Sequence, residues 1–130
     1  MRLVYLLLAD YANTTADGKL NVMGVFNSIA AKHFPARHPN MFITAKLEPE
    51  IGDSDQMSQL TITLEDSDGH EINTTALPIE AKRNPIGITL GVNIILQITD
   101  TVLGRPGLYQ ISLYLNNEPL GRVGFTAAQV

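Results

Sequence analysis

The chain has 130 residues and a formal net charge of −4, and this length predicts a single domain, residues 1–130, whose core needs neither metal ions nor disulfides. It contains no cysteine, which excludes thiol catalysis, disulfide bonds and thiolate-held zinc or iron–sulfur sites. Basic and acidic residues are scattered along the sequence, and because nucleic-acid binding needs a basic face, we expect no nucleic-acid partner.

Apolar and polar residues alternate along most of the chain, and this period of two is typical of half-buried strands. The alternation is clearest at 88–98, where every second residue is Ile, Leu or Val. No segment has a sustained helical period, so we expect little or no helix. The strands are predicted, in chain order, near 2–9, 20–30, 41–48, 58–66, 71–80, 88–99, 108–115 and 119–126.

Turn-forming residues separate these segments. Asp17-Gly18, Asp68-Gly69 and Asn116-Asn117 are typical of tight hairpins. Residues 49–55 and 82–87 have the composition of longer loops. The pattern therefore predicts neighbouring strands that run antiparallel.

Strands with one apolar face must bury that face against a second layer. We therefore predict an all-β protein, an antiparallel two-sheet β-sandwich of about eight strands with immunoglobulin-like or C2-like architecture. Tyr109 follows Gly107-Leu108 at the start of a predicted strand. A tyrosine in this place is also found near a corner of immunoglobulin-like sandwiches, although a plain core tyrosine fits equally well.

The first two predicted strands depart from simple alternation. The first is apolar on both faces, through Leu3, Val4, Tyr5, Leu6, Leu7 and Leu8. Either a loop or another subunit must cover its second face, because an uncovered strand of this kind promotes aggregation. We therefore expect a protein partner or self-association through this strand. The run is too short for a membrane span, which needs about 20 apolar residues.

The second strand, 20–30, changes phase near Gly24, where we predict a β-bulge.

Residues 7–26 carry a distinctive combination of motifs: Asp10-Tyr11-Ala12, then Gly18-Lys19-Leu20, then Gly24-Val25-Phe26. This combination resembles a family of small bacterial all-β proteins with no assigned biochemical role. The resemblance implies a β-sandwich in a bacterial cytoplasm. It supplies no catalytic residues.

Two acidic loops are candidates for calcium binding. The first contains Asp10, Asn13 and Asp17, and the second contains Asp66 and Asp68. Calcium prefers six to eight oxygen ligands, so loops at one end of a sandwich would have to combine. Turn formation explains the same residues, because Asp and Asn bond their own backbone in turns.

Two further groups are candidate binding residues. Asp10, Tyr11 and Asn13 precede the Asp17-Gly18 turn, and no hairpin rule requires them there. A basic loop at 31–40 contains Lys32, His33, Arg37 and His38. These side chains suit an anion or an acidic partner surface, although a solvated loop has the same composition.

Catalytic patterns are missing from the sequence. No Gly-x-Ser-x-Gly motif or phosphate-binding glycine loop occurs, so we expect no catalytic residues and no cofactor. The sequence favours a non-enzymatic binding or assembly module. A calcium- or small-ligand-binding sandwich is the alternative, and a small hydrolase with a carboxylate pair is a third hypothesis.

Overall fold

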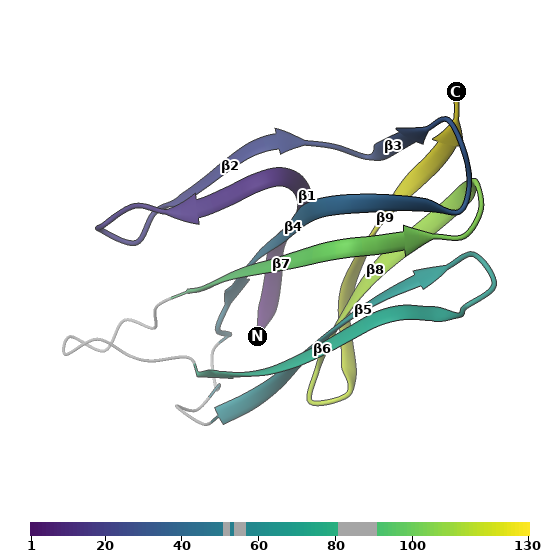
Figure 1. The fold of residues 1–130 in the computed structure, drawn as a ribbon. Coiled ribbons are helices and arrows are strands. Elements are labelled where there is room, and N and C mark those ends of the chain that lie inside the picture. The colour runs from purple at the N-terminus through teal and green to yellow at the C-terminus, as the bar shows by residue number, and fades with distance from the viewer. Residues whose placement is uncertain (51–52, 54–56, 81–90) are drawn as a thin grey trace.

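The computed structural model describes residues 1–50, 53, 57–80 and 91–130. In these ranges the regular secondary structure consists of β-strands alone (Figure 1). The prediction of an all-β protein is therefore confirmed. Within the described residues, no helix could cross a membrane. The strands are β1 (Arg2–Thr14), β2 (Leu20–Val25), β3 (Ser28–Ala31), β4 (Ala36–Glu48), β5 (Met57–Asp66), β6 (Glu71–Glu80), β7 (Val92–Leu103), β8 (Gly107–Leu115) and β9 (Glu118–Gln129).

The strands form two sheets. The four-stranded sheet has the order β2-β1-β4-β7, and the five-stranded sheet has the order β3-β9-β8-β5-β6. All neighbours are antiparallel except β3 and β9, which run parallel. The two sheets share one core, to which both contribute fully buried side chains, among them Leu8, Ile43, Leu64, Ile111 and Phe125.

The segment predicted as one strand at 20–30 is divided between the two sheets. β2 pairs with β1, whereas β3 pairs with β9. The chain crosses between them at Phe26 and Asn27: the Phe26 N–H donates to the Leu8 carbonyl at 2.9 Å, and the Thr126 N–H donates to the Asn27 carbonyl at 3.0 Å. This crossover accounts for the change of phase. Gly24 has φ +69°, which a glycine adopts without strain.

Four strands extend three or more residues beyond their predicted ends. β1 continues to Thr14, β4 begins at Ala36, β7 ends at Leu103 and β9 ends at Gln129. In β7, Asp100 has φ +54°, and the alternation of buried residues shifts by one position there. Even-numbered Ile98 is buried before Asp100, whereas odd-numbered Thr101 and Leu103 are buried after it. A prediction based on strict alternation ends the strand where the alternation shifts, which is why the predicted strand stopped at 99. The predicted start of this strand at 88 and the loop at 82–87 lie outside the described residues.

The doubly apolar segment of β1 pairs with β4 along one of its edges. β4 pairs with residues 2–9 of β1, whereas β2 pairs with residues 9–14. Leu8 is buried in the core, and Leu3 and Leu6 pack against that core. The core of this chain therefore covers one face of the segment, whereas Val4 is 42% exposed.

Candidate functional site

The hairpin formed by β1 and β2 holds the first group of candidates. Asp10, Tyr11 and Asn13 lie within β1 rather than in a loop. The Asp10 carboxylate lies over Gly24, where an added Cβ would come within 2.5 Å of its Oδ2 atom. The Asn21 side-chain amide donates to Asn13 Oδ1 at 3.0 Å. Asp10 and Asn13 are thus tied to the opposite strand of the hairpin.

Tyr11 belongs to an exposed group of apolar side chains on the same hairpin. Tyr11 pairs across the strands with Met23, and Val25 pairs with Ala9 two positions along, so all three large side chains lie on one face. They are 44%, 57% and 58% exposed, respectively. We call Tyr11, Met23 and Val25 the apolar hairpin surface.

A buried phenylalanine supports this surface. Phe42 of β4 pairs with Ala9 on the same face and is only 6% exposed. Its ring meets the Tyr11 ring edge to face, with the ring centroids 5.2 Å apart. Because Tyr11 is also paired with Met23 in the hairpin, its side chain is held in place by both its strand and the Phe42 ring.

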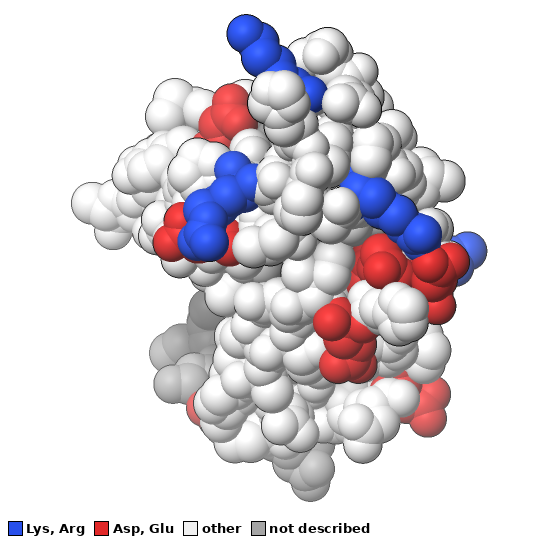
Figure 2. Space-filling model, turned by 45° about the vertical axis from the view of Figure 1, so that its right-hand side comes forward, with Lys and Arg blue, Asp and Glu red and all other residues white. Residues whose placement is uncertain are grey.

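The basic group does not form a single site. Arg37 and His38 lie in β4, where neighbouring side chains point to opposite sides. Arg37 is exposed and pairs with Asp100 at 3.8 Å, whereas His38 turns its ring toward Phe26, 6.1 Å away. Lys32 and His33 are exposed beyond β3. On the face drawn in Figure 2, basic side chains lie directly beside acidic ones.

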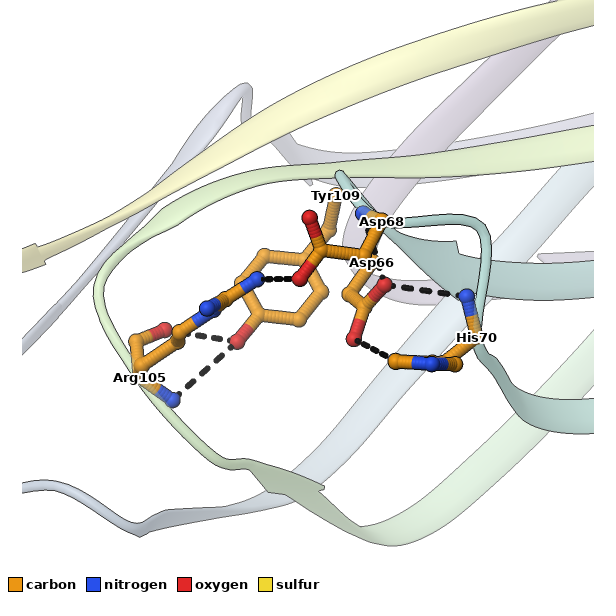
Figure 3. Close-up of polar contacts among 5 residues, drawn as sticks. All are labelled: Asp66, Asp68, His70, Arg105 and Tyr109. Carbon is orange, nitrogen blue, oxygen red and sulfur yellow. Dashed lines mark hydrogen bonds and ion pairs between the residues drawn. The ribbon is translucent and has the colours of Figure 1, made fainter.

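The acidic turn between β5 and β6 is held by its own hydrogen bonds (Figure 3). Asp66 Oδ1 accepts the backbone N–H groups of Asp68 at 2.9 Å and His70 at 3.0 Å. The His70 N–H is the main cause that lowers the pKa of Asp66 below its ordinary value. Asp68 forms an ion pair with Arg105. The Arg105 carbonyl in turn accepts the Tyr109 hydroxyl at 2.6 Å.

These contacts bear on metal binding at the turn. Ligand atoms of Asp66, Asp68 and His70 lie within 4.8 Å of one another. However, Asp66 already accepts two N–H groups, and Arg105 already neutralises Asp68. Hydrogen bonding within the turn therefore explains this cluster without a cation.

The two acidic loops considered for calcium do not meet. The hairpin turn that holds Asp17 lies at one end of the molecule, and the turn that holds Asp68 lies at the opposite end (Figure 1). Asp17 is also locally bonded, and hydrogen bonds from Thr15 and then Lys19 lower its pKa. The structure thus separates Asp10, Asn13 and Asp17 from Asp66 and Asp68.

Sequence reasoning found Tyr11 but missed Met23 and Val25. Their signal is the alternation Asn21, Met23, Val25, which places two large apolar side chains on one face of β2. The residue opposite each of them is known only once the register of the hairpin is known. The missing information was therefore the pairing of strands.

Comparison with solved structures finds a weak likeness to a DNA-binding protein. This is the Pseudomonas fluorescens alkylpurine DNA glycosylase AlkC bound to DNA containing an abasic site analog, at 15% identity and a TM-score of 0.48. The match covers 95% of this chain and 30% of the glycosylase chain. At this level the likeness assigns no activity to the present protein.

The expectation about partners is corrected. The sequence was taken to exclude nucleic acid and to favour a protein partner or self-association through Leu3, Val4, Tyr5, Leu6, Leu7 and Leu8. That prediction is wrong as stated: the similar structure is described as bound to DNA, and Leu3, Leu6 and Leu8 lie in or against the core of this chain.

No curated protein matches the chain. The motifs of residues 7–26 resemble a family without an assigned role. A family model whose function is also unknown matches residues 4–128. The chain belongs to this family, which is described as a family of unknown function (DUF6941).

Proposed function

We propose that this protein is a non-enzymatic binding module and that the apolar hairpin surface is its contact surface. The observation that carries the proposal is the joint exposure of Tyr11, Met23 and Val25 on one face. Single exposed apolar residues are common, whereas adjacent ones often mark interaction sites. Tyrosine and methionine are also enriched at the centres of protein interfaces.

The rigidity of this surface supports the proposal. Tyr11 contacts the buried Phe42 ring, and its backbone position in β1 is paired with Met23 of β2. A side chain that is already held in place loses little conformational freedom on binding. The surface can therefore contribute affinity without first having to become ordered.

The polar groups of the described residues support a role without catalysis. No hydrogen bond in the described ranges joins a serine or threonine hydroxyl to a histidine, as a nucleophile and its base would require. The clearest cluster of titratable side chains, around Asp66, is explained by its turn.

We also infer that the two sheets are arranged as an immunoglobulin-like β-sandwich. Tyr109 lies near the start of β8, after the connection from β7 in the other sheet, and its hydroxyl donates to the Arg105 carbonyl four residues upstream. This contact is similar to the tyrosine corner of immunoglobulin-like domains, which supports the inference. An experimental structure with the Tyr109 hydroxyl turned away from Arg105 would contradict this inference.

Photo-crosslinking in cells tests the contact surface. We propose a bacterial cytoplasmic location, as the family resemblance implies, so the experiment is done in the bacterial host. A photoreactive amino acid replaces Met23, and in a matched control it replaces Thr126, which is exposed on β9 of the other sheet. We expect a discrete adduct from position 23 and none from position 126.

Digestion of the adduct with nuclease or with protease then identifies the class of the partner. Either class supports a binding module, provided that a second substitution, Tyr11→Ala, abolishes the adduct. The proposal fails if position 23 yields no adduct, or if the two positions yield the same one.

A further inference from the structure

The outer face of the five-stranded sheet has hydroxyl groups at its centre. Thr63 of β5 pairs directly with Ser112 of β8, and each is only 6% exposed. Their chain neighbours, such as Ile62 and Ile111, belong to the core, so these hydroxyls point away from it. Outward-facing side chains with so little exposure form the floor of a depression.

The strand register extends this floor across four strands. Thr74 of β6 pairs with Thr63, and Arg122 of β9 pairs with Ser112. On one side of this row, Glu65 pairs with Gln110, and on the other side, Thr61 pairs with Tyr114. A row of hydroxyl groups therefore lies between a carboxylate–amide pair and an aromatic ring.

Two open hollows lie over this floor and share Tyr114 as a wall. One, of about 410 Å³, is lined by residues that include Gln110, Ser112 and Arg122. The other, of about 320 Å³, is lined by residues that include Thr63 and Glu65. Each volume falls in the range of about 300–1,000 Å³ that is usual for small-molecule sites.

The polar groups of the floor are already oriented. The Gln110 side-chain amide donates to Ser112 Oγ at 3.1 Å and to Glu65 Oε1 at 3.3 Å. Ser112 accepts in this contact, so its own hydrogen remains for donation. Arg122 offers donors at one end of the row, and Glu65 offers a carboxylate acceptor beside it.

A sugar ring combines the properties that this face matches. Its hydroxyls both donate and accept, as the row of Ser and Thr hydroxyls does, and its C–H face suits the ring of Tyr114. An anion would meet the carboxylates of Glu65 and Glu71, and a cation would meet Arg122. We propose that the outer face of the five-stranded sheet binds a neutral saccharide across β6, β5, β8 and β9. This site is distinct from the apolar hairpin surface.

Titration of the full chain with neutral hexasaccharides tests this site. The probes are maltohexaose, cellohexaose, xylohexaose and mannohexaose, and the readout is the backbone amide NMR spectrum. We expect millimolar binding of at least one probe, with the largest shifts at Thr63, Ser112 and Tyr114. Absence of binding for all four, or shifts confined to the other sheet, would overturn the proposal.

Matched tyrosine variants locate the contact. Tyr114→Ala is expected to weaken binding about tenfold, and Tyr114→Phe, which keeps the ring, to stay within about threefold of the wild type. Tyr11→Ala, on the other sheet, should leave saccharide binding unchanged. Equal losses for Tyr11→Ala and Tyr114→Ala would contradict the site. Arg122→Gln, at an exposed position, tests it independently if Tyr114→Ala fails to fold, with an expected loss of about threefold.

Discussion

The outer faces of the two sheets differ in their chemistry although both cover the same core. On the four-stranded sheet, Tyr11 and Met23 stand exposed beside a buried Phe42. On the five-stranded sheet, Thr63 and Ser112 form a polar floor. The inward-facing side chains of both sheets build a shared apolar core, whereas the outward-facing side chains are not constrained by that core and differ between the sheets. We therefore infer two binding chemistries on one scaffold.

Truncation of Phe42 should have the largest effect on stability. Phe42→Ala removes a ring that is 6% exposed and contacts Tyr11, so we expect a loss of about 3 kcal/mol in the free energy of unfolding. Chemical denaturation measures it. Gln97→Ala changes the exposed residue that pairs with Phe42 and should cost only about 0.5 kcal/mol. Equal losses would show that the outer face of the four-stranded sheet holds no packed layer.

Removal of a buried hydroxyl should change the free energy of unfolding in opposite directions on the two outer faces. Thr44 is fully buried on the outer face of the four-stranded sheet, and its Oγ1 atom has no hydrogen-bond partner among the residues that the structure describes. Thr44→Val should therefore raise the free energy of unfolding by about 1 kcal/mol. Ser112 accepts a hydrogen bond from Gln110, so Ser112→Ala should lower it by about 1 kcal/mol.

Thermal and chemical unfolding of these two variants provide the measurement. The contrast between the faces is lost if both substitutions destabilise the protein equally.

The acidic turn should give the smallest effect, and one that depends on pH. The pKa of Asp66 is lowered in the folded state, chiefly by the His70 N–H. Its stabilising contribution is present above the unfolded-state pKa of about 3.9 and is lost as the pH falls through the lower folded-state pKa. Asp66→Asn should therefore show a smaller fall in Tm below about pH 4 than the wild type.

A pH series of melting curves checks this expectation. Glu118→Gln, which changes an exposed carboxyl at the start of β9, should retain the slope of the wild type. Parallel curves for the wild type and Asp66→Asn would show that the turn contributes no pH-dependent stability.

Much of the fold follows from alternation along single strands. Residues 71–80 were predicted as a strand and form β6, and 58–66 matches β5 within one residue. The chain crossover at Phe26 and Asn27 was not predicted, because alternation records which face a residue occupies but not which sheet it joins. The change of face at Asp100 was missed for a similar reason, since it depends on one backbone angle.

The candidate sites were less accessible from the sequence. Tyr11 was identified because no turn rule required it there. Its neighbours Met23 and Val25 become part of the same surface only through the register of β1 and β2. The pairing of Thr63 with Ser112 joins strands that are distant in sequence. Such surfaces arise from pairing, which alternation within one strand does not encode.

The affinity of the crosslinked partner for two tyrosine variants tests the central claim most directly. Tyr11 and Tyr114 are aromatic side chains on the outer faces of opposite sheets. Titration calorimetry should show that Tyr11→Ala weakens binding of this partner about tenfold or more, while Tyr114→Ala leaves it unchanged. Unchanged affinity for Tyr11→Ala, or a loss only for Tyr114→Ala, would contradict the assignment of the apolar hairpin surface as the contact surface.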